Sequence, residues 1–258
     1  MTSPNLFGFF LLFHRLSPFS LLSSNRRLIC YPAYCITVSA VLLMIFRFYW
    51  MIFRIDSPFL NFQWAESKLY GFVSLESAIL TVALIKMGAT RSLESTQRSL
   101  QELQNLRLEK IQKIKDNYRV LWCRAFFGAL FVFLSFSLTS IYLAVHKKAL
   151  LDSKSSWYWI LDPIAAILGA YSNFLFLPVH ALRAHAVARE FEVFNEEMAE
   201  ADREKRLVNP HVLREFGARQ IKMFEYANFL TDRMERFMIW APALSILAFL
   251  MASYVVSE

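Results

Sequence analysis

The sequence predicts an all-α fold, a polytopic membrane helical bundle with long cytosolic helical extensions. Hydrophobic residues make up 56% of the 258 residues. They collect into stretches of about 20, the length that a helix needs to cross a hydrocarbon layer. Only six glycines and eight prolines are present, which favours long helices over turn-rich β-structure. The apolar stretches do not alternate as barrel strands would, so helices must satisfy their backbone groups in lipid.

Five apolar stretches are expected to cross the membrane. They cover residues 33–53, 69–87, 121–145, 157–182 and 237–256. The links after the first and third stretches are short, whereas those after the second and fourth are long and charged. The expected parts are a cytosolic or interfacial segment (1–32), four membrane helices (33–182) with a helical link (88–120), a cytosolic helical hairpin (183–236), and a fifth membrane helix with a short outer tail (237–258).

The distribution of lysine and arginine predicts the orientation, because positive side chains in short loops resist translocation. With the N-terminus inside, three lie in the leader, nine in the second link with its flanks and ten in the fourth link. That places 22 inside against five outside, with Arg47 left within the first span. We therefore expect a cytosolic N-terminus and both long links inside the cell.

Both long links have the apolar spacing of helices. In the second link, apolar residues at 100, 103, 111, 114, 118 and 121 mark one face of a helix expected to continue into the third span. The fourth link is interrupted by Asn209-Pro210, which predicts an antiparallel hairpin. Its returning helix has a stripe at three- and four-residue spacing: Leu213, Phe216, Gln220, Met223, Ala227, Leu230, Met234 and Phe237. This stripe either closes the hairpin on itself or packs against neighbouring subunits.

Two carboxylates within the spans need an explanation, because a charge in lipid costs roughly 2.5 to 3.5 kcal/mol. Glu76 lies in the middle of the second span and Asp162 near the outer start of the fourth. One interpretation is an outward-opening ligand pocket formed by both, with Trp159, Tyr171 and Asn173. The alternatives are an interfacial aromatic belt for the tryptophans and, for Glu76, structural pairing with Ser137 or Thr139.

Several classes of function are not supported by the sequence. The net charge of +7 is explained by cytosolic loops, and no basic face is interleaved with exposed aromatics, so no nucleic acid partner is expected. The five histidines and three cysteines match no metal or catalytic spacing, and no phosphate-binding glycine loop is present. We expect no enzyme activity, no cofactor and no metal, and membrane lipid as one partner.

Two segments resemble insect-type gustatory receptors. The opening, FGFFLLFHRLSPFSLLSSNRRLICYPAYCITVSAVLLMI, has an apolar leader, a Pro18-Phe19 turn and a short basic stretch before the first span. The fourth link, FEVFNEEMAEADREKRLVNPHVLREFGARQIKMFEYANFLTDRMERF, has that family's long helix pair before the fifth span. The resemblance covers nearly the whole chain and rests mainly on the layout of the helices.

The resemblance implies a multi-pass chemoreceptor of the plasma membrane, with its N-terminus in the cytosol, that gates cation flow when a small-molecule tastant binds. It implies a homo- or hetero-oligomer, a tetramer in that family, with a pocket in the outer halves of spans two to four. The stripe residues implied to form the subunit anchor are Leu213, Phe216, Met223, Leu230, Met234 and Phe237.

One departure from that family concerns the pore. Its Thr-Tyr and Gln-Phe signature lies in a seventh helix, whereas this chain stops at Glu258 after the fifth span. We therefore expect a fragment or a diverged relative that does not conduct alone. Two other classes stay open: a G-protein-coupled type of chemoreceptor, whose outside N-terminus conflicts with the charge distribution, and a non-enzymatic scaffold or transporter subunit.

Overall fold

The computed structural model describes residues 6–18, 27–54, 62–107, 118–150 and 158–257. Some side chains within these helices lie outside the described set, among them those of residues 158–159 and 231–239. The described chain is helical, without strands, which confirms the all-α class. Its elements are α1 (Phe9–Leu16), α3 (Arg27–Tyr49), η1 (Trp50–Arg54), α4 (Phe62–Ala89), α5 (Ser92–Asn105), α7 (Tyr118–Leu150), α8 (Tyr158–Arg203), η2 (Arg206–Val208) and α9 (Pro210–Ser257).

Four helical stretches within the described residues are long and apolar enough to cross a membrane, so this is a membrane protein. They are Cys30–Phe53, Ser67–Ala89, Tyr118–Tyr142 and Ile160–Arg203. Each begins within about three residues of an expected span. The last is 44 residues long, or about 66 Å of helix, so α8 extends well beyond a hydrocarbon layer of roughly 30 Å. The charged residues from Arg183 onward form this extension.

The fifth expected span, residues 237–256, is the C-terminal end of α9. Its backbone is helical to Ser257. Many of its side chains lie outside the described residues, and it is not among the four stretches. This span therefore stays a prediction.

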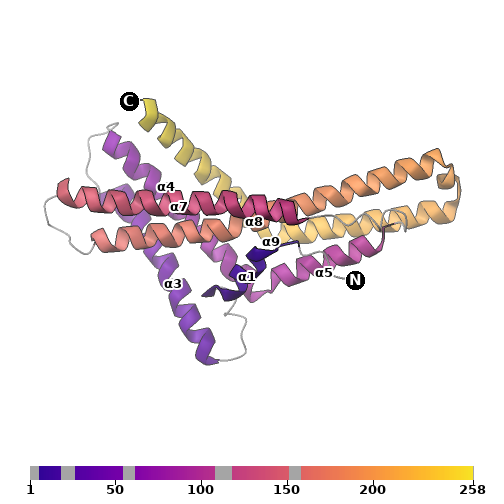
Figure 1. Ribbon diagram of the computed structural model, residues 1–258, viewed down its shortest axis with the longest axis horizontal. Helices are drawn as coiled ribbons and strands as arrows, with labels where there is room; N and C mark the ends of the chain where they lie inside the picture. Colours follow the sequence, from indigo (N-terminus) through magenta and orange to yellow (C-terminus); the bar gives the residue numbers. More distant parts are fainter. Residues whose placement is uncertain (1–5, 19–26, 55–61, 108–117, 151–157, 258) are drawn as a thin grey trace.

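The helices form a bundle from which a long arm projects (Figure 1). α7 packs along the first half of α8, and α4 packs against α3, α8 and α9. Outside the bundle, residues 183–203 of α8, residues 210–230 of α9 and α5 lie together, and we call these three segments the arm (Figure 1). The lipid-facing surface of α7 is apolar, with Phe127 and Phe131 both exposed. This matches a helix whose outer surface is solvated by acyl chains.

A local sequence signal forms the turn at the tip of the arm. α8 ends at Arg203, and Lys205 adopts a left-handed conformation with φ of 54°. Pro210 then occupies the first position of α9, where its missing N–H is not needed. The side-chain oxygen of Asn209 accepts a hydrogen bond from the backbone N–H of His211 at 3.0 Å, which caps the new helix. The expected hairpin is therefore present.

The stripe on the returning helix divides between the interior of the hairpin and its surface. Phe216 and Met223 are buried, and Phe216 meets Phe194 of α8 with ring centroids 5.8 Å apart. Leu213 is 57% exposed, and Leu230 is partly buried at the edge of the core. The side chains of Met234 and Phe237 lie outside the described residues. The hairpin thus closes on itself through part of the stripe.

The expectation that one helix runs from Leu100 into the third span is wrong. α5 ends at Asn105, and the chain turns at Leu106, whose N–H bonds the carbonyl of Leu103 at 3.0 Å. The physical reason is Arg107, which leaves the helix axis to form a buried ion pair with Glu190 of α8. This ion pair holds the end of α5 against α8 within the arm.

The N-terminal segment is more buried than an interfacial helix needs to be. Leu6, Phe7 and Phe10 have no exposed surface and belong to the main core. Gly8 permits this close packing: its φ is 49°, and a Cβ there would lie 2.4 Å from the ring of Trp122. The opposite face of α1 remains exposed, so the helix packs on protein with one side and meets its surroundings with the other.

Candidate functional site

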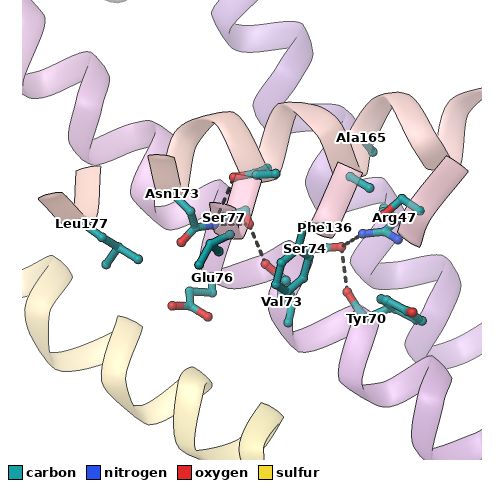
Figure 2. A pocket seen from close by; sticks show the side chains of 15 residues that line it. Arg47, Tyr70, Val73, Ser74, Glu76, Ser77, Phe136, Ala165, Asn173 and Leu177 are labelled. Carbon is teal, nitrogen blue, oxygen red and sulfur yellow. Dashed lines mark hydrogen bonds between the residues drawn. The ribbon is translucent and has the colours of Figure 1, made fainter. Parts of the chain in front are cut away.

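A cavity of about 210 Å³ lies inside the bundle between α4, α7 and α8, and Figure 2 shows its lining. α4 contributes Tyr70, Val73, Ser74, Glu76 and Ser77; α7 contributes Val132, Phe136 and Ser140; α8 contributes Ala165, Ala166, Gly169, Ala170, Asn173 and Leu177; and α3 contributes Arg47. The cavity is mostly apolar with a few polar groups, which is the usual composition of small-molecule sites. Its volume is below the roughly 300 Å³ at which pockets for drug-sized ligands begin, so a smaller molecule fits it best.

One wall of the cavity is held by hydrogen bonds between α4 and α8. The side-chain nitrogen of Asn173 donates to Ser77 Oγ at 3.0 Å and to the carbonyl of Gly169 at 3.0 Å. One turn further along α4, the hydroxyls of Thr81 and Ser172 lie 2.7 Å apart. Small residues permit this approach, since a Cβ on Gly169 would lie 2.9 Å from Ser77 Oγ. Polar and small side chains of this kind commonly join helices in membranes.

A buried ion pair closes one end of the cavity. The Nε atom of Arg47 in α3 donates to Asp162 Oδ1 of α8 at 2.7 Å, and its terminal nitrogen donates to Ser74 Oγ of α4 at 2.9 Å. The side chains of Arg47 and Asp162 are only 7% and 17% exposed. The guanidinium also lies over the ring of Tyr70, 5.5 Å from its centroid. One cation thereby ties three helices together at the cavity.

Five residues were predicted to line a ligand pocket, and the structure places only some of them at the cavity. Glu76 and Asn173 line the cavity. Asp162 does not line it, but binds Arg47, which does. Tyr171 packs half-buried against the main core, away from the lining. The side chain of Trp159 lies outside the described residues.

Of the two hydroxyls suggested as alternative partners for Glu76, that of Ser137 does not bond to it. Ser137 is buried, and its hydroxyl has no hydrogen-bond partner among the described residues. Thr139 is exposed on α7. In Figure 2 the Glu76 carboxylate lies at the opposite end of the cavity from Arg47. The cavity therefore has the ion-paired guanidinium of Arg47 at one end and the carboxyl group of Glu76 at the other, an arrangement suited to a small ligand with complementary polar groups.

Sequence reasoning missed Arg47 and Ser74 as site residues. Arg47 was noted only as an arginine left within the first span. An ionisable residue at membrane depth, however, indicates a partner or a function. Asp162 lay at a similar distance from the expected outer surface in the fourth span. Pairing these two opposite charges by depth would have found the contact.

A second set of buried charges lies in the arm. Arg107 bonds Glu190, with Nε to Oε2 at 3.2 Å, and Arg219 of α9 bonds Glu197 of α8. Arg183 donates to Ser92 Oγ at 3.0 Å. Burial lowers the pKa of Arg219; the neighbouring Glu190 acts to raise it and Arg107 to lower it. The two ion pairs are therefore close enough to form one electrostatic network. Within the described residues, no group of three or more histidine, cysteine or acidic side chains could hold a metal ion.

Comparison with known proteins identifies a family without a known activity. Residues 6–258 match the model of DUF267, described as a Caenorhabditis protein of unknown function. No curated protein matches the chain, and no solved structure does. Since the match spans nearly the whole sequence, the chain belongs to the DUF267 family of Caenorhabditis proteins.

Proposed function

We propose that this chain is a chemosensory receptor subunit that binds a small polar molecule in the cavity between α4, α7 and α8. It works at the plasma membrane, with the N-terminus and the arm in the cytosol, as a subunit of a ligand-gated cation channel of the gustatory-receptor type. The observation that carries the proposal is the cavity itself. It lies at membrane depth and presents the Arg47 guanidinium at one end and the Glu76 carboxylate at the other.

The free-energy cost of burying the charged groups of Arg47 and Glu76 favours a ligand-binding role for the cavity over a purely structural one. A helix bundle can pack with apolar side chains alone, and charged groups in lipid are rare unless they face an interior or an aqueous space. Here one ion pair and two serine hydroxyls surround an apolar space that a packed core would fill. A site of this composition fixes the orientation of a small ligand through few polar contacts.

The proposed orientation is supported by the charges outside the spans. The arm and the turn at its tip carry eight of the ten basic residues assigned to the fourth link, and positive residues near membrane helices favour the cytosolic side. In that orientation Arg47 and Asp162 lie in the outer half of the membrane, and we propose that ligands reach the cavity from the outside. A G-protein-coupled type of receptor would need the reverse, and a scaffold subunit would need no water-accessible cavity.

Cysteine labelling in intact cells tests the cavity. In a background with Cys30, Cys35 and Cys123 replaced by serine, Ser77→Cys is expected to react with a positively charged, membrane-impermeant methanethiosulfonate reagent added outside. The matched control is Ser172→Cys, because Ser172 is as buried as Ser77, at 1% against 2% exposed, but faces Thr81 and does not line the cavity. Ser77→Cys should react at least about tenfold faster, since only its side chain reaches the cavity.

A panel of small polar tastants then extends the same assay. A ligand of the cavity should slow the labelling of Ser77→Cys by occupying the space next to the thiol. No labelling of Ser77→Cys from outside, or equal labelling of both variants, would contradict an outward-opening site and favour the scaffold alternative.

A further inference from the structure

The charges around the cavity between α4, α7 and α8 do not cancel. Among the described lining residues, the formally charged side chains are those of Arg47 and Glu76. The guanidinium of Arg47 is already balanced by Asp162 at 2.7 Å, and it lies over the ring of Tyr70. Counting Asp162 with the lining gives one positive and two negative formal charges. The negative charge that is left over belongs to Glu76, at the far end of the cavity from Arg47.

The serine hydroxyls in this lining are already used as donors. The hydroxyl of Ser77, the residue next to Glu76, donates to the carbonyl of Val73 at 2.8 Å. The hydroxyl of Ser74 donates in the same way to the carbonyl of Tyr70 at 2.8 Å. Since each hydroxyl has one proton, these two serines can offer a ligand only their oxygen lone pairs.

The amide of Asn173 likewise has only its oxygen left for a ligand. Its nitrogen donates to Ser77 Oγ and to the carbonyl of Gly169, both at 3.0 Å, which uses both of its protons. The carbonyl of Gly169 can only accept, so the nitrogen must face it and the oxygen must point elsewhere. In Figure 2 this oxygen points towards the side on which the Glu76 carboxylate lies. The bond to Ser77 also holds Asn173 at the level of Glu76 along α4. This end of the cavity is therefore rich in acceptors.

We propose that the cavity binds a small protonated amine, with its ammonium group against the carboxylate of Glu76 and the side-chain oxygen of Asn173. An ammonium group carries three donors and no acceptor, which complements an end of the cavity that offers acceptors. A carboxylate at membrane depth commonly serves as the counter-ion of a cation, including that of a ligand. This inference rests on the proposed function, for which it names the class of ligand.

The apolar lining and the volume determine the rest of the ligand. A volume of about 210 Å³, at about 30 Å³ for each water in the liquid, has room for about seven non-hydrogen atoms. Val132, Phe136 and Leu177 provide an apolar surface for a hydrocarbon body. The ring of Phe136 also suits a cation, because an aromatic face attracts positive charge. Cyclohexylamine is a ligand of this size, and its amine is protonated near pH 7 as that of lysine is.

Titration of the purified full chain in a neutral detergent, followed by saturation-transfer NMR of the ligand, tests the ligand class. Cyclohexylamine, cyclohexanol and cyclohexanecarboxylate share one ring and differ in charge. The amine should bind about tenfold more tightly than the alcohol, because it adds a charge-assisted bond. The carboxylate should bind more weakly than the alcohol. The net charge of +7 on the chain would favour the opposite order, so general electrostatic attraction cannot produce this result.

Substitution of Glu76 assigns the preference to this end of the cavity. Glu76→Gln should weaken the binding of cyclohexylamine about tenfold and leave that of cyclohexanol unchanged, which also shows that the variant is folded. Glu76→Asp keeps the charge and should keep the preference for the amine. Glu102→Gln is the matched control, because it removes the same charge from an exposed position on α5 that does not line the cavity. It should leave both affinities unchanged.

Several results would overturn the amine proposal. They are no binding of cyclohexylamine, equal binding of the amine and the alcohol, or tightest binding of the carboxylate. Binding of the amine to Glu76→Gln as tightly as to the unaltered chain, or an equal loss in Glu102→Gln, would also contradict it. Binding in detergent does not depend on the orientation in the membrane. Amine binding without outside labelling of Ser77→Cys would therefore contradict only the receptor proposal, whereas labelling without a preference for the amine would contradict only the ligand class.

Discussion

Replacing Arg47 by methionine is expected to be the most destabilising single change in the membrane bundle. Arg47→Met removes the guanidinium from a largely buried Asp162 and also removes the hydrogen bond to Ser74. Breaking a buried ion pair by deleting one partner costs about 3 to 5 kcal/mol. The midpoint of thermal unfolding in detergent, followed by size-exclusion chromatography of a fluorescent fusion, should fall by on the order of 10 °C.

A double-mutant cycle separates this effect from a simple loss of packing. Arg47→Met with Asp162→Leu replaces the ion pair by apolar side chains of similar length, which in buried sites is often neutral or stabilising. The double variant should therefore recover most of the loss. Arg47→Lys should recover less, because one ammonium group does not reproduce the guanidinium's planar set of donors to Asp162 and Ser74. Equal destabilisation by Arg47→Met and by the double variant would contradict the pairing.

In the arm, the largest loss is expected for Glu190→Gln. Glu190 is 2% exposed, and its substitution leaves the Arg107 guanidinium, 4% exposed, without its counter-ion. The cost should again be about 3 to 5 kcal/mol. Because Arg107 lies close to the end of α5, the loss should release this helix from α8. Limited proteolysis at residues 92–107, measured together with thermal unfolding, reports on both effects.

A nearby exposed ion pair provides the matched control. Glu192 lies two residues further along α8 and pairs with Arg189 at 3.1 Å, with Glu192 64% exposed. Glu192→Gln should cost no more than about 1 kcal/mol, as exposed pairs usually do. If Glu190→Gln were as mild as Glu192→Gln, the arm would not depend on its buried charges. Protection of residues 92–107 should then be unchanged in both variants.

Patterns that repeat along a single helix could be predicted from the sequence. The four apolar stretches were found because the bilayer sets their length, and the hairpin turn was found because Asn209-Pro210 stops one helix and starts the next. Phe216 and Met223 were correctly expected on an apolar face of the returning helix. These features depend on neighbours within a few residues, which a single sequence shows directly.

Contacts between distant parts of the chain were not predictable in the same way. Arg47 and Asp162 are 115 positions apart, and Arg107 and Glu190 are 83 apart. Arg219 and Glu197 bury one another inside the hairpin, although the sequence alone shows each of them only as one of the many charges in the fourth link. A charge that is buried by its partner looks, in the sequence, like a charge that is solvated. The burial of Phe7 and Phe10 beneath α7 and α8 was also missed, because it depends on helices far away in the sequence.

The orientation of the arm is the claim on which the proposed receptor most directly depends. An epitope inserted after Val208, in the exposed turn between α8 and α9, measures it directly. Antibody should bind this epitope only after the cells are permeabilised, whereas an epitope placed in residues 55–61, between the first two spans, should be stained on intact cells. Staining of the Val208 epitope on intact cells would place the arm outside and contradict the account.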